Sequence, residues 1–308
     1  MIRLENLSKG YGRVEALAGL SMTVPEGSIF GFVGPNGAGK TTTLRILATL
    51  LKPSGGRALI GDEDVVAHPE RVRQMIGYMP DFFGVYDDLK VTEYLDFYGQ
   101  AHGVVSGVRK RMIGDLLSLV DLEDKADAYV DSLSRGMKQR LCLARCLIHD
   151  PAVLLLDEPA SGLDPRARVE MRELVKELSH MGKTVVVSSH ILSELSEMCT
   201  EVGIIDHGRL VRSGPVDEVL SGVKSGRLVS IRTIERQDEL AEALRQLPGV
   251  RDVAVFDGRL EAVIDGDAAR LNETLRALIA QGYPVYSFGE QINSLEETFL
   301  KLTGSEAQ

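Results

Sequence analysis

The first two-thirds of the chain alternates short β-branched apolar runs with longer amphipathic runs, which is the pattern of an α/β protein. Continuous apolar runs at residues 152–159 and 183–190 predict strands that are buried on both faces. Between them, residues 164–182 have helical periodicity, with Asp164 as a candidate N-cap and Gly182 as a candidate stop. These elements predict a sheet that is covered by helices.

The pattern changes in two places along the chain. From about residue 88 to 146 the strand signal disappears and helical periodicity replaces it, which predicts an inserted helical subdomain. A small-residue break at 221–226 predicts a linker after a first domain of residues 1–220. Residues 227–308 then follow the order β-α-β-β-α-β, which is typical of a split βαβ, ferredoxin-like α+β domain, and a last helix is expected within SLEETFLKLTG.

Composition excludes several classes of protein. The formal net charge of −10 argues against a nucleic-acid partner, because such proteins need a basic face. Three cysteines are too few for a disulfide framework, and Cys142 and Cys146 are interpreted as small buried apolar residues rather than metal ligands. No run approaches the roughly 18 apolar residues of a membrane span. A protein of this composition that works at a membrane needs another chain for the membrane part.

A glycine-rich segment, GPNGAGKTT, follows a predicted strand and precedes a predicted helix. It fits the pattern G-x-x-x-x-G-K-[ST] in the structural context that the pattern requires. The glycines let successive N–H groups converge on phosphate oxygens, and the helix N-terminus adds positive potential. We therefore expect a nucleotide-phosphate site, with an ordinary glycine-rich turn as the alternative. The residues expected to bind the nucleotide here are Gly34, Pro35, Asn36, Gly37, Ala38, Gly39, Lys40, Thr41 and Thr42.

Two other strand ends carry polar side chains that complete this site. Asp157 ends a buried strand, where α/β ligands gather, and is predicted to hold Mg²⁺ together with the Thr41 hydroxyl. Glu158 follows it, and the turn at the next residue is expected to swing it toward the γ-phosphate to polarise a water. His190 is predicted to hydrogen-bond the γ-phosphate. The candidate catalytic residues are Glu158, His190 and Lys40; a solvated strand end and a helix-capping histidine are the alternatives.

Five elements occur in one order along the chain: Tyr11, the glycine-rich segment, LSRGMKQR, LLLDEPASGLD and VSSH. This set resembles the ATP-binding subunit of ABC transporters over roughly residues 1–220. The C-terminal domain is similar to one found on some exporter-type members. The resemblance implies a P-loop NTPase of ABC type in which two head-to-tail chains close on ATP and reopen after hydrolysis.

The resemblance also implies roles for single residues. Tyr11 would stack on adenine, as an aromatic face can. Ser134 and the N–H of Gly136, within LSRGM, would bind the γ-phosphate of ATP held by a second subunit, and Asp164 would contact that subunit. The local sequence agrees for Ser134, because a serine at the start of a helix can cap it and leave its N-terminus free to receive an anion.

Three residues depart from the family pattern. Arg135 stands where the signature usually has glycine, Met137 where it usually has glutamine, and Asp81 where the family usually has glutamine. Aspartate is shorter and anionic, but its oxygens suit Mg²⁺ or a metal-bound water. We therefore hypothesise that Asp81 is a metal ligand that senses the nucleotide and couples it to the rest of the machine. The alternative is that Asp81 has left the site and starts a turn with Pro80.

The segment after Asp81 is rich in apolar and aromatic residues. In the family this region meets the membrane permease, so its side chains are candidate partner contacts, while packing inside the helical subdomain is the equal alternative. The candidate contact residues are Phe82, Phe83, Val85 and Tyr86.

Taken together, the residues and the resemblance predict an ATPase that uses ATP and Mg²⁺ and powers an exporter. It would lie at the cytoplasmic face of the cell membrane through a separate permease and pair with a second ATPase subunit, expected to be a second copy. One alternative is a soluble ABC-type ATPase acting on nucleic acid or ribosomes, which the acidic net charge disfavours. Another is a nucleotide-binding scaffold without turnover, which the full set of catalytic residues disfavours. The C-terminal domain is interpreted either as a dimerisation or packing module or as a regulatory domain.

Overall fold

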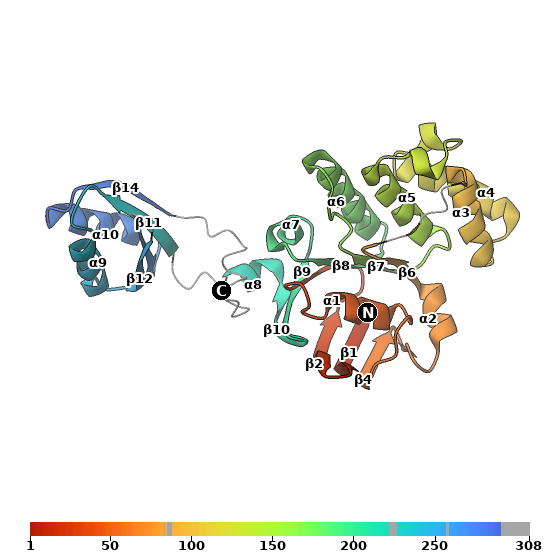
Figure 1. Cartoon of the computed structure of the whole chain (residues 1–308), viewed down its shortest axis with the longest axis horizontal. Coiled ribbons are helices and arrows are strands. Elements are labelled where there is room, and N and C mark those ends of the chain that lie inside the picture. The colour runs from red at the N-terminus through yellow and green to blue at the C-terminus, as the bar shows by residue number, and fades with distance from the viewer. Residues whose placement is uncertain (83, 85–87, 222–226, 257–258, 291–308) are drawn as a thin grey trace. The chain divides into compact units, whose positions relative to one another are not determined.

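The computed structural model describes most of the chain and divides it into two compact units, Met1–Val216 and Asp217–Gln308 (Figure 1). The expected domain bounds stay a prediction, because most of the expected linker lies outside the described residues. The predicted last helix also lies outside them. The structure describes residues 1–82, 84, 88–221, 227–256 and 259–290.

The larger unit is built on a six-stranded sheet in the order β10-β9-β3-β8-β7-β6. Neighbouring strands are parallel except at one edge, where β10 runs antiparallel to β9. Every residue of β3, β7 and β8 is buried, which accounts for the continuous apolar runs in the sequence. The strands are β3 (Ile29–Val33), β6 (Ile76–Met79), β7 (Val153–Asp157), β8 (Thr184–Ser189), β9 (Glu201–Asp206) and β10 (Arg209–Pro215).

A second sheet, β2-β1-β4-β5, is antiparallel and is one that the sequence analysis does not predict. Helix α1 (Lys40–Leu47) lies between the two sheets in Figure 1, and residues of both sheets and of α1 share one buried core. Register shifts interrupt the pairing of β1 with β2, and β1 loses its alternation after Leu4. In β2, buried and exposed residues do alternate from Ala18 to Val24, a period-two signal that was not used to predict this sheet. Its strands are β1 (Ile2–Tyr11), β2 (Val14–Val24), β4 (Gly55–Ile60) and β5 (Glu63–Asp64).

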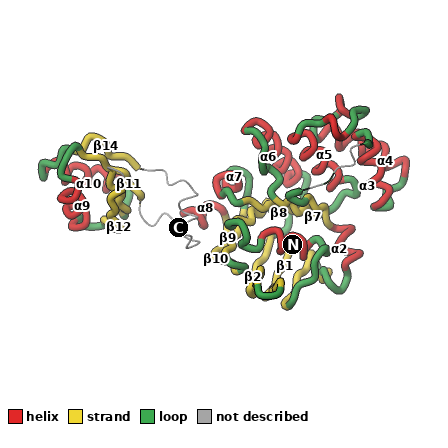
Figure 2. The backbone as a smooth tube through the Cα atoms, in the orientation of Figure 1, coloured by secondary structure: helices red, strands yellow, loops and turns green. Residues whose placement is uncertain are grey.

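Helices cover the other face of the central sheet, as Figure 2 shows for α6 (Pro165–His180) and α7 (Leu192–Ser196). The predicted cap of α6 is confirmed, because Asp164 Oδ1 accepts hydrogen bonds from two backbone N–H groups of the first turn, each at 3.0 Å. The predicted stop is confirmed as well, since Gly182 follows the helix with φ of 84°.

The predicted inserted helical subdomain is confirmed between β6 and β7. Its last helix, α5, packs against β6 so closely that a side chain on Gly77 would overlap the Cys146 carbonyl oxygen. Cys142 and Cys146 are buried and free, which confirms their interpretation as apolar residues. The subdomain comprises α3 (Val91–Ala101), α4 (Ser106–Leu119), the short 3₁₀ turns η1 (Glu123–Lys125) and η2 (Val130–Ser132), and α5 (Arg135–Leu147), while α2 (Pro69–Met75) precedes β6.

The smaller unit confirms the predicted order β-α-β-β-α-β. Its antiparallel sheet runs β12-β13-β11-β14, and the core lies between this sheet and the two helices. Burial alternates along β13, where every second residue is fully buried. Its elements are β11 (Arg227–Thr233), α9 (Gln237–Gln246), β12 (Val250–Phe256), β13 (Arg259–Ile264), α10 (Ala268–Ala280) and β14 (Val285–Glu290), preceded by α8 (Val216–Ser221).

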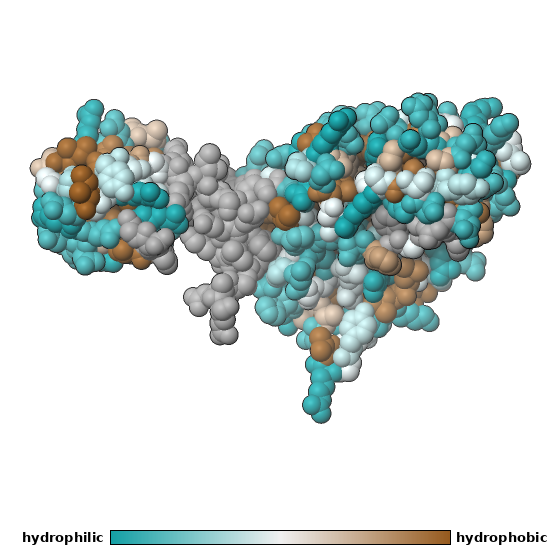
Figure 3. Space-filling model, turned by 45° about the horizontal axis from the view of Figure 1, so that its top comes forward, coloured by the Kyte–Doolittle hydropathy of each residue, from teal (hydrophilic) through white to brown (hydrophobic). Residues whose placement is uncertain are grey.

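The surface is mainly hydrophilic on the face drawn in Figure 3, with apolar side chains in scattered patches. Among the described residues, no helix has both the length and the apolar character that a membrane crossing requires.

Candidate functional site

A pocket of about 470 Å³ opens at the carboxyl ends of β3, β7 and β8. This is the edge of a parallel sheet where ligands bind in α/β proteins, because the loops that leave the strands there can converge. The residues that line it come from the glycine-rich segment, from the ends of β6, β7 and β8, and from β2. They are Val14, Ala16, Pro35, Asn36, Gly37, Gly39, Lys40, Thr41, Thr42, Asp81, Glu158, Ser161 and His190.

The glycine-rich segment wraps around the Lys40 side chain. Lys40 Nζ donates hydrogen bonds to the carbonyl oxygens of Gly34, at 2.6 Å, and Pro35, at 3.3 Å. Gly39, directly before α1, has φ of 109°, and a Cβ there would lie 2.7 Å from Ala16 O. Only glycine fits this conformation and this space, so the segment turns sharply and brings the N-terminus of α1 to the pocket.

The Lys40 ammonium is buried together with a carboxylate. Its side chain is 6% exposed, that of Glu158 is 13% exposed, and Nζ lies 3.5 Å from Glu158 Oε1. Burial lowers the pKa of Lys40, and the charges of Glu158 and Asp157 oppose this change. The cation is therefore held by backbone carbonyls and one carboxylate, partners that a phosphate can replace.

Asp157 has one carboxylate oxygen that is fully engaged and one that is not. Asp157 Oδ1 accepts hydrogen bonds from Ser188 Oγ at 2.7 Å and Thr41 Oγ1 at 3.2 Å. The other oxygen, Oδ2, is buried with no hydrogen-bond partner in the described structure. Burial raises the pKa of Asp157, while the two hydroxyl donors lower it. A buried oxygen without a partner is costly, and a cation beside it would remove that cost.

The donor set fits Mg²⁺ better than a metal that needs an all-protein cage. Within the described part of the chain, no group of three His, Cys, Asp or Glu side chains is arranged to hold a metal ion. Magnesium typically takes one or two carboxylates and completes its shell with waters and substrate phosphates. The Asp157 carboxylate and the Thr41 hydroxyl match that demand.

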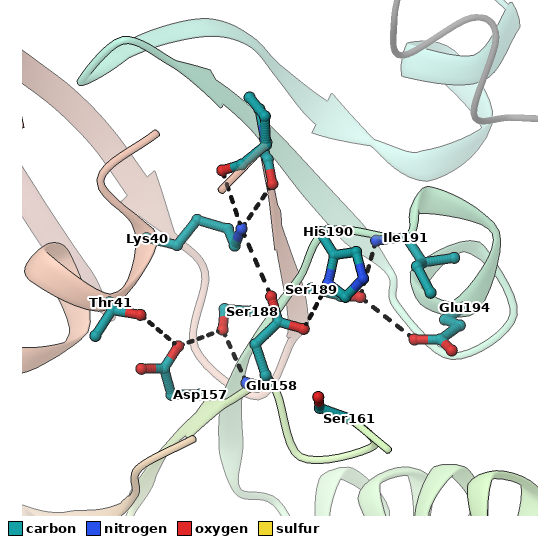
Figure 4. Close-up of polar contacts among 12 residues, drawn as sticks. Lys40, Thr41, Asp157, Glu158, Ser161, Ser188, Ser189, His190, Ile191 and Glu194 are labelled. Carbon is teal, nitrogen blue, oxygen red and sulfur yellow. Dashed lines mark hydrogen bonds and ion pairs between the residues drawn. The ribbon is translucent and has the colours of Figure 1, made fainter. Parts of the chain in front are cut away.

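Glu158 turns away from the line of β7 into the pocket. Its φ is 51°, a left-handed conformation that is costly for a residue other than glycine. Its N–H donates to Ser188 Oγ at 3.0 Å, so the Ser188 hydroxyl contacts both acidic residues. Glu158 Oε2 lies 2.9 Å from His190 Nδ1, and Figure 4 shows the glutamate between the histidine and Lys40.

The position of His190 is fixed by the turn that follows β8. Ile191 N–H donates to Ser189 Oγ at 3.0 Å, and Ser189 Oγ donates to Glu194 Oε2 at 3.3 Å (Figure 4). His190 itself is 46% exposed and lines the pocket. The histidine is thus oriented without being buried.

The structure brings most of the predicted site residues together, but not all of them. Asp81 lines the pocket, whereas Tyr11, Ser134 and Gly136 do not. Tyr11 lies at the end of β1 and is 48% exposed, and Ser134 caps α5 by accepting a hydrogen bond from the first turn at 3.3 Å. Ala38 is buried beneath the segment rather than in the pocket wall.

The aromatic segment is described only in part. Phe82 is 89% exposed, which agrees with a partner contact and not with packing inside the helical subdomain. Phe83, Val85 and Tyr86 lie outside the described residues. Their expected role stays a prediction.

Sequence reasoning missed Ser188, the hydroxyl that joins Asp157 and Glu158. Its only signal is its place in the parallel register, where Ser188 of β8 lies opposite Asp157 of β7. It also missed three residues of the pocket wall, which carry no motif of their own: Val14, Ala16 and Ser161.

Comparison with known protein families gives two matches. Residues 17–161 match the ABC transporter family, and residues 214–303 match the family described as ATP-binding protein DrrA1-3-like, C-terminal domain. The first match includes the glycine-rich segment, Asp157 and Glu158, and the second covers most of the smaller unit.

Curated relatives are similar over nearly the whole chain. The linearmycin resistance ATP-binding protein LnrL of Bacillus subtilis is 32% identical over 99% of this chain and 98% of its own length. The Nod factor export ATP-binding protein I of Ralstonia nicotianae is 37% identical over 99% and 94%. The daunorubicin resistance ATP-binding protein DrrA2 of Streptomyces coeruleorubidus is 36% identical over 98% and 95%. These relatives support export and give no support to the nucleic-acid alternative.

Solved structures agree with the fold. An ATP-binding subunit of an ABC transporter superposes with a TM-score of 0.66 at 28% identity, covering 72% of this chain and 92% of that one. A dimeric ATP-binding cassette in a post-hydrolysis state, bound to ADP and Pi, superposes with a TM-score of 0.64 at 26% identity, covering 70% and 99%. The chain therefore belongs to the ATP-binding subunits of exporter-type ABC transporters, and it is an ATPase that powers transport.

Proposed function

We propose that ATP is hydrolysed in the pocket between Lys40 and His190, with Glu158 as the base that polarises the attacking water. The observation that carries this proposal is the position of the Glu158 carboxylate. It lies 3.5 Å from Lys40 Nζ and 2.9 Å from His190 Nδ1, on a backbone held in a left-handed conformation. Strained backbone of this kind persists where the surrounding structure requires it, and it is concentrated at active sites.

Each side chain has a distinct task in this proposal. Lys40 leaves the carbonyl oxygens of Gly34 and Pro35 and neutralises the β and γ phosphates. Glu158 then accepts a hydrogen bond from a water and takes its proton as the water attacks. His190 donates to the γ-phosphate and keeps the Glu158 carboxylate in place. Mg²⁺, when bound, withdraws charge from the phosphate oxygens and orients them.

Replacing the proposed base tests this assignment directly. Glu158→Gln keeps the shape of the side chain but cannot accept a proton, so turnover should fall by about 10²–10⁴-fold while ATP is still bound. The measurements are the steady-state rate of phosphate release and the equilibrium binding of ATP by the full chain.

The matched control is Glu173→Gln on the exposed face of α6, where Glu173 pairs only with neighbours of its own helix in the described contacts. That variant should hydrolyse ATP at the parent rate. Normal turnover by Glu158→Gln would show that another residue is the base.

We propose that Thr41, Asp157 and Asp81 hold the Mg²⁺ of MgATP. The unpartnered Asp157 Oδ2 and the nearby Thr41 hydroxyl support a cation here. Asp81 follows β6, the strand next to β7, and lines the same pocket, which favours a ligand role over a turn outside the site. The negative charge of Asp81 is felt by both Lys40 and Asp157: it raises the pKa of Lys40, against the effect of burial, and it also raises the pKa of Asp157.

A Mg²⁺ titration of ATP binding separates the two aspartates. Asp157→Asn should raise the Mg²⁺ concentration needed for half-maximal ATP binding by about tenfold or more, since ligand and neighbouring changes typically cost 10–100-fold in metal affinity. Asp81→Asn should cause a smaller increase. Asp115→Asn, an exposed position on α4, is the control and should leave the titration unchanged. An unchanged titration for Asp81→Asn would place Asp81 outside the metal site.

We propose that two copies of this chain pair head to tail, so that Ser134 and Gly136 of one copy face the nucleotide of the other. Neither residue lines the pocket of its own chain, which supports a role toward a partner, and so does the dimeric state of a structural relative. Ser134 caps α5 and leaves the helix N-terminus exposed to receive an anion.

We further propose that the chain docks at the cytoplasmic face of the membrane on a separate permease, through a groove at the junction of β6, α3 and α5. Arg145 and Arg73 both line this cavity of about 310 Å³. In the described structure neither arginine has a carboxylate within ion-pair distance. Arg145 instead packs over the Tyr98 ring at 5.1 Å and reaches the Tyr78 carbonyl oxygen at 3.4 Å. Cations without acidic partners in a chain of net charge −10 favour an acidic side chain of the permease as the occupant.

Charge reversal on α2 tests the docking groove. Arg73→Glu should weaken binding of the full chain to detergent-solubilised permease by about tenfold, because a repulsion replaces an attraction. Arg71→Glu makes the same charge change two residues away, where the arginine pairs with Glu63, and should bind nearly as the parent does. ATP binding by the uncomplexed chain should be unchanged in both variants. Equal binding of the permease by both variants would exclude the groove as the docking site.

A further inference from the structure

The first residue of α5, Arg135, contacts the loop that follows β7. Arg135 Nη2 donates to the Ser161 carbonyl oxygen at 3.0 Å, and Gln139 Nε2 donates to the same oxygen at 3.2 Å. These two residues are four positions apart and therefore share one face of the helix. The loop is thus held to the first two turns of α5 by two side chains on a single carbonyl oxygen.

The loop is shaped to receive the Arg135 guanidinium. Gly162 has φ of 66°, and a side chain at this position would overlap the guanidinium atoms. The backbone conformation favours glycine, and the absence of a side chain leaves the space that the Arg135 guanidinium fills. A residue without a side chain at 135, the usual choice of the family, could make none of these contacts.

The same loop carries the proposed base at one end and a helix cap at the other. Ser161 N–H donates to the Glu158 carbonyl oxygen at 3.0 Å, and Ser161 lines the pocket beside the Glu158 side chain. At the far end, Asp164 caps α6. The five residues between these ends, 159–163, include Ser161, whose carbonyl oxygen accepts hydrogen bonds from both Arg135 and Gln139.

We propose that Arg135 is a positioning residue, which holds the loop of residues 158–164 so that Glu158 keeps its left-handed conformation. This inference rests on the proposed role of Glu158. Arg135 lies next to Ser134, at the helix N-terminus that faces the nucleotide of the second copy. A movement of that N-terminus moves Ser161 through the Arg135 side chain. Because coupling between two sites is reciprocal, a change in the loop of residues 158–164 moves the N-terminus of α5 with the same coupling free energy. Arg135 thereby joins two segments of one chain that serve two different nucleotides.

Kinetics of the full chain test this link. Arg135→Ala should lower kcat for ATP hydrolysis by about tenfold and leave KM within about twofold, because the loop orients Glu158 while the glycine-rich segment binds the phosphates. Arg135→Lys keeps a cation that can reach the Ser161 carbonyl and should recover part of the lost kcat. Lys138→Ala, on the next turn of the same helix, is the matched control and should keep the parent values. Thermal unfolding should be similar for all of these variants.

A double substitution separates this positioning role from a general loss of structure, because it measures whether the effects of Arg135 and Gly162 on kcat depend on each other. Gly162→Ala should lower kcat strongly in the parent, since the new methyl group displaces the guanidinium. In the Arg135→Ala background the same change should lower kcat by a smaller factor, because the obstructed group is gone. Independent effects on kcat, or Arg135→Ala with parental kcat, would overturn the proposal. If Glu158→Gln still abolishes turnover in that case, the role of the base stands and only the link through Arg135 fails.

Discussion

The desolvation of charged side chains at the carboxyl edge of the central sheet governs the architecture of the larger unit. Lys40 and Asp157 are 6% and 1% exposed, and charges so far from water require partners at short range. Three buried parallel strands bring those partners together: the carbonyls after β3, the acidic pair at the end of β7, and the Ser188 hydroxyl of β8. The left-handed conformation of Glu158 is the local strain that this arrangement requires.

Much of this organisation can be predicted from the sequence, because its causes are local. Buried strands are recognised as continuous apolar runs. The starts of α5 and α6 are recognised from Ser134 and Asp164, whose side chains can cap a helix N-terminus. In the antiparallel sheet, register shifts break the alternation of apolar residues in β1, so only β2, which alternates from Ala18 to Val24, carries a local signal for it. Ser188 is missed because its role arises only when β8 pairs with β7 and sets it opposite Asp157. Residue spacing within one strand contains no information of that kind.

Two of the departures from the family pattern, Asp81 and Arg135, are found where segments meet, and none lies in the glycine-rich segment. Asp81 follows β6 and lines the pocket, while residues of β6 itself line the groove, where Arg145 has no acidic partner among the described residues. Arg135 stands between α5 and the loop of the proposed base. Both lie outside the glycine-rich segment, and in the proposals above they act on how the state of the nucleotide is passed to neighbouring segments. Such positions are the ones at which related machines can differ in coupling while they share one reaction.

The equilibrium affinity of the full chain for MgATP, compared between the parent and Lys40→Met, tests the central claim most directly. Lys40 is the one buried cation among the described residues that line the pocket, and its removal takes away a charge-assisted contact to the phosphates. We expect the dissociation constant to rise by about tenfold or more, since such contacts contribute about 1.5–3 kcal/mol. An unchanged affinity in a variant that unfolds at the parental temperature would contradict the assignment of this pocket as the ATP site.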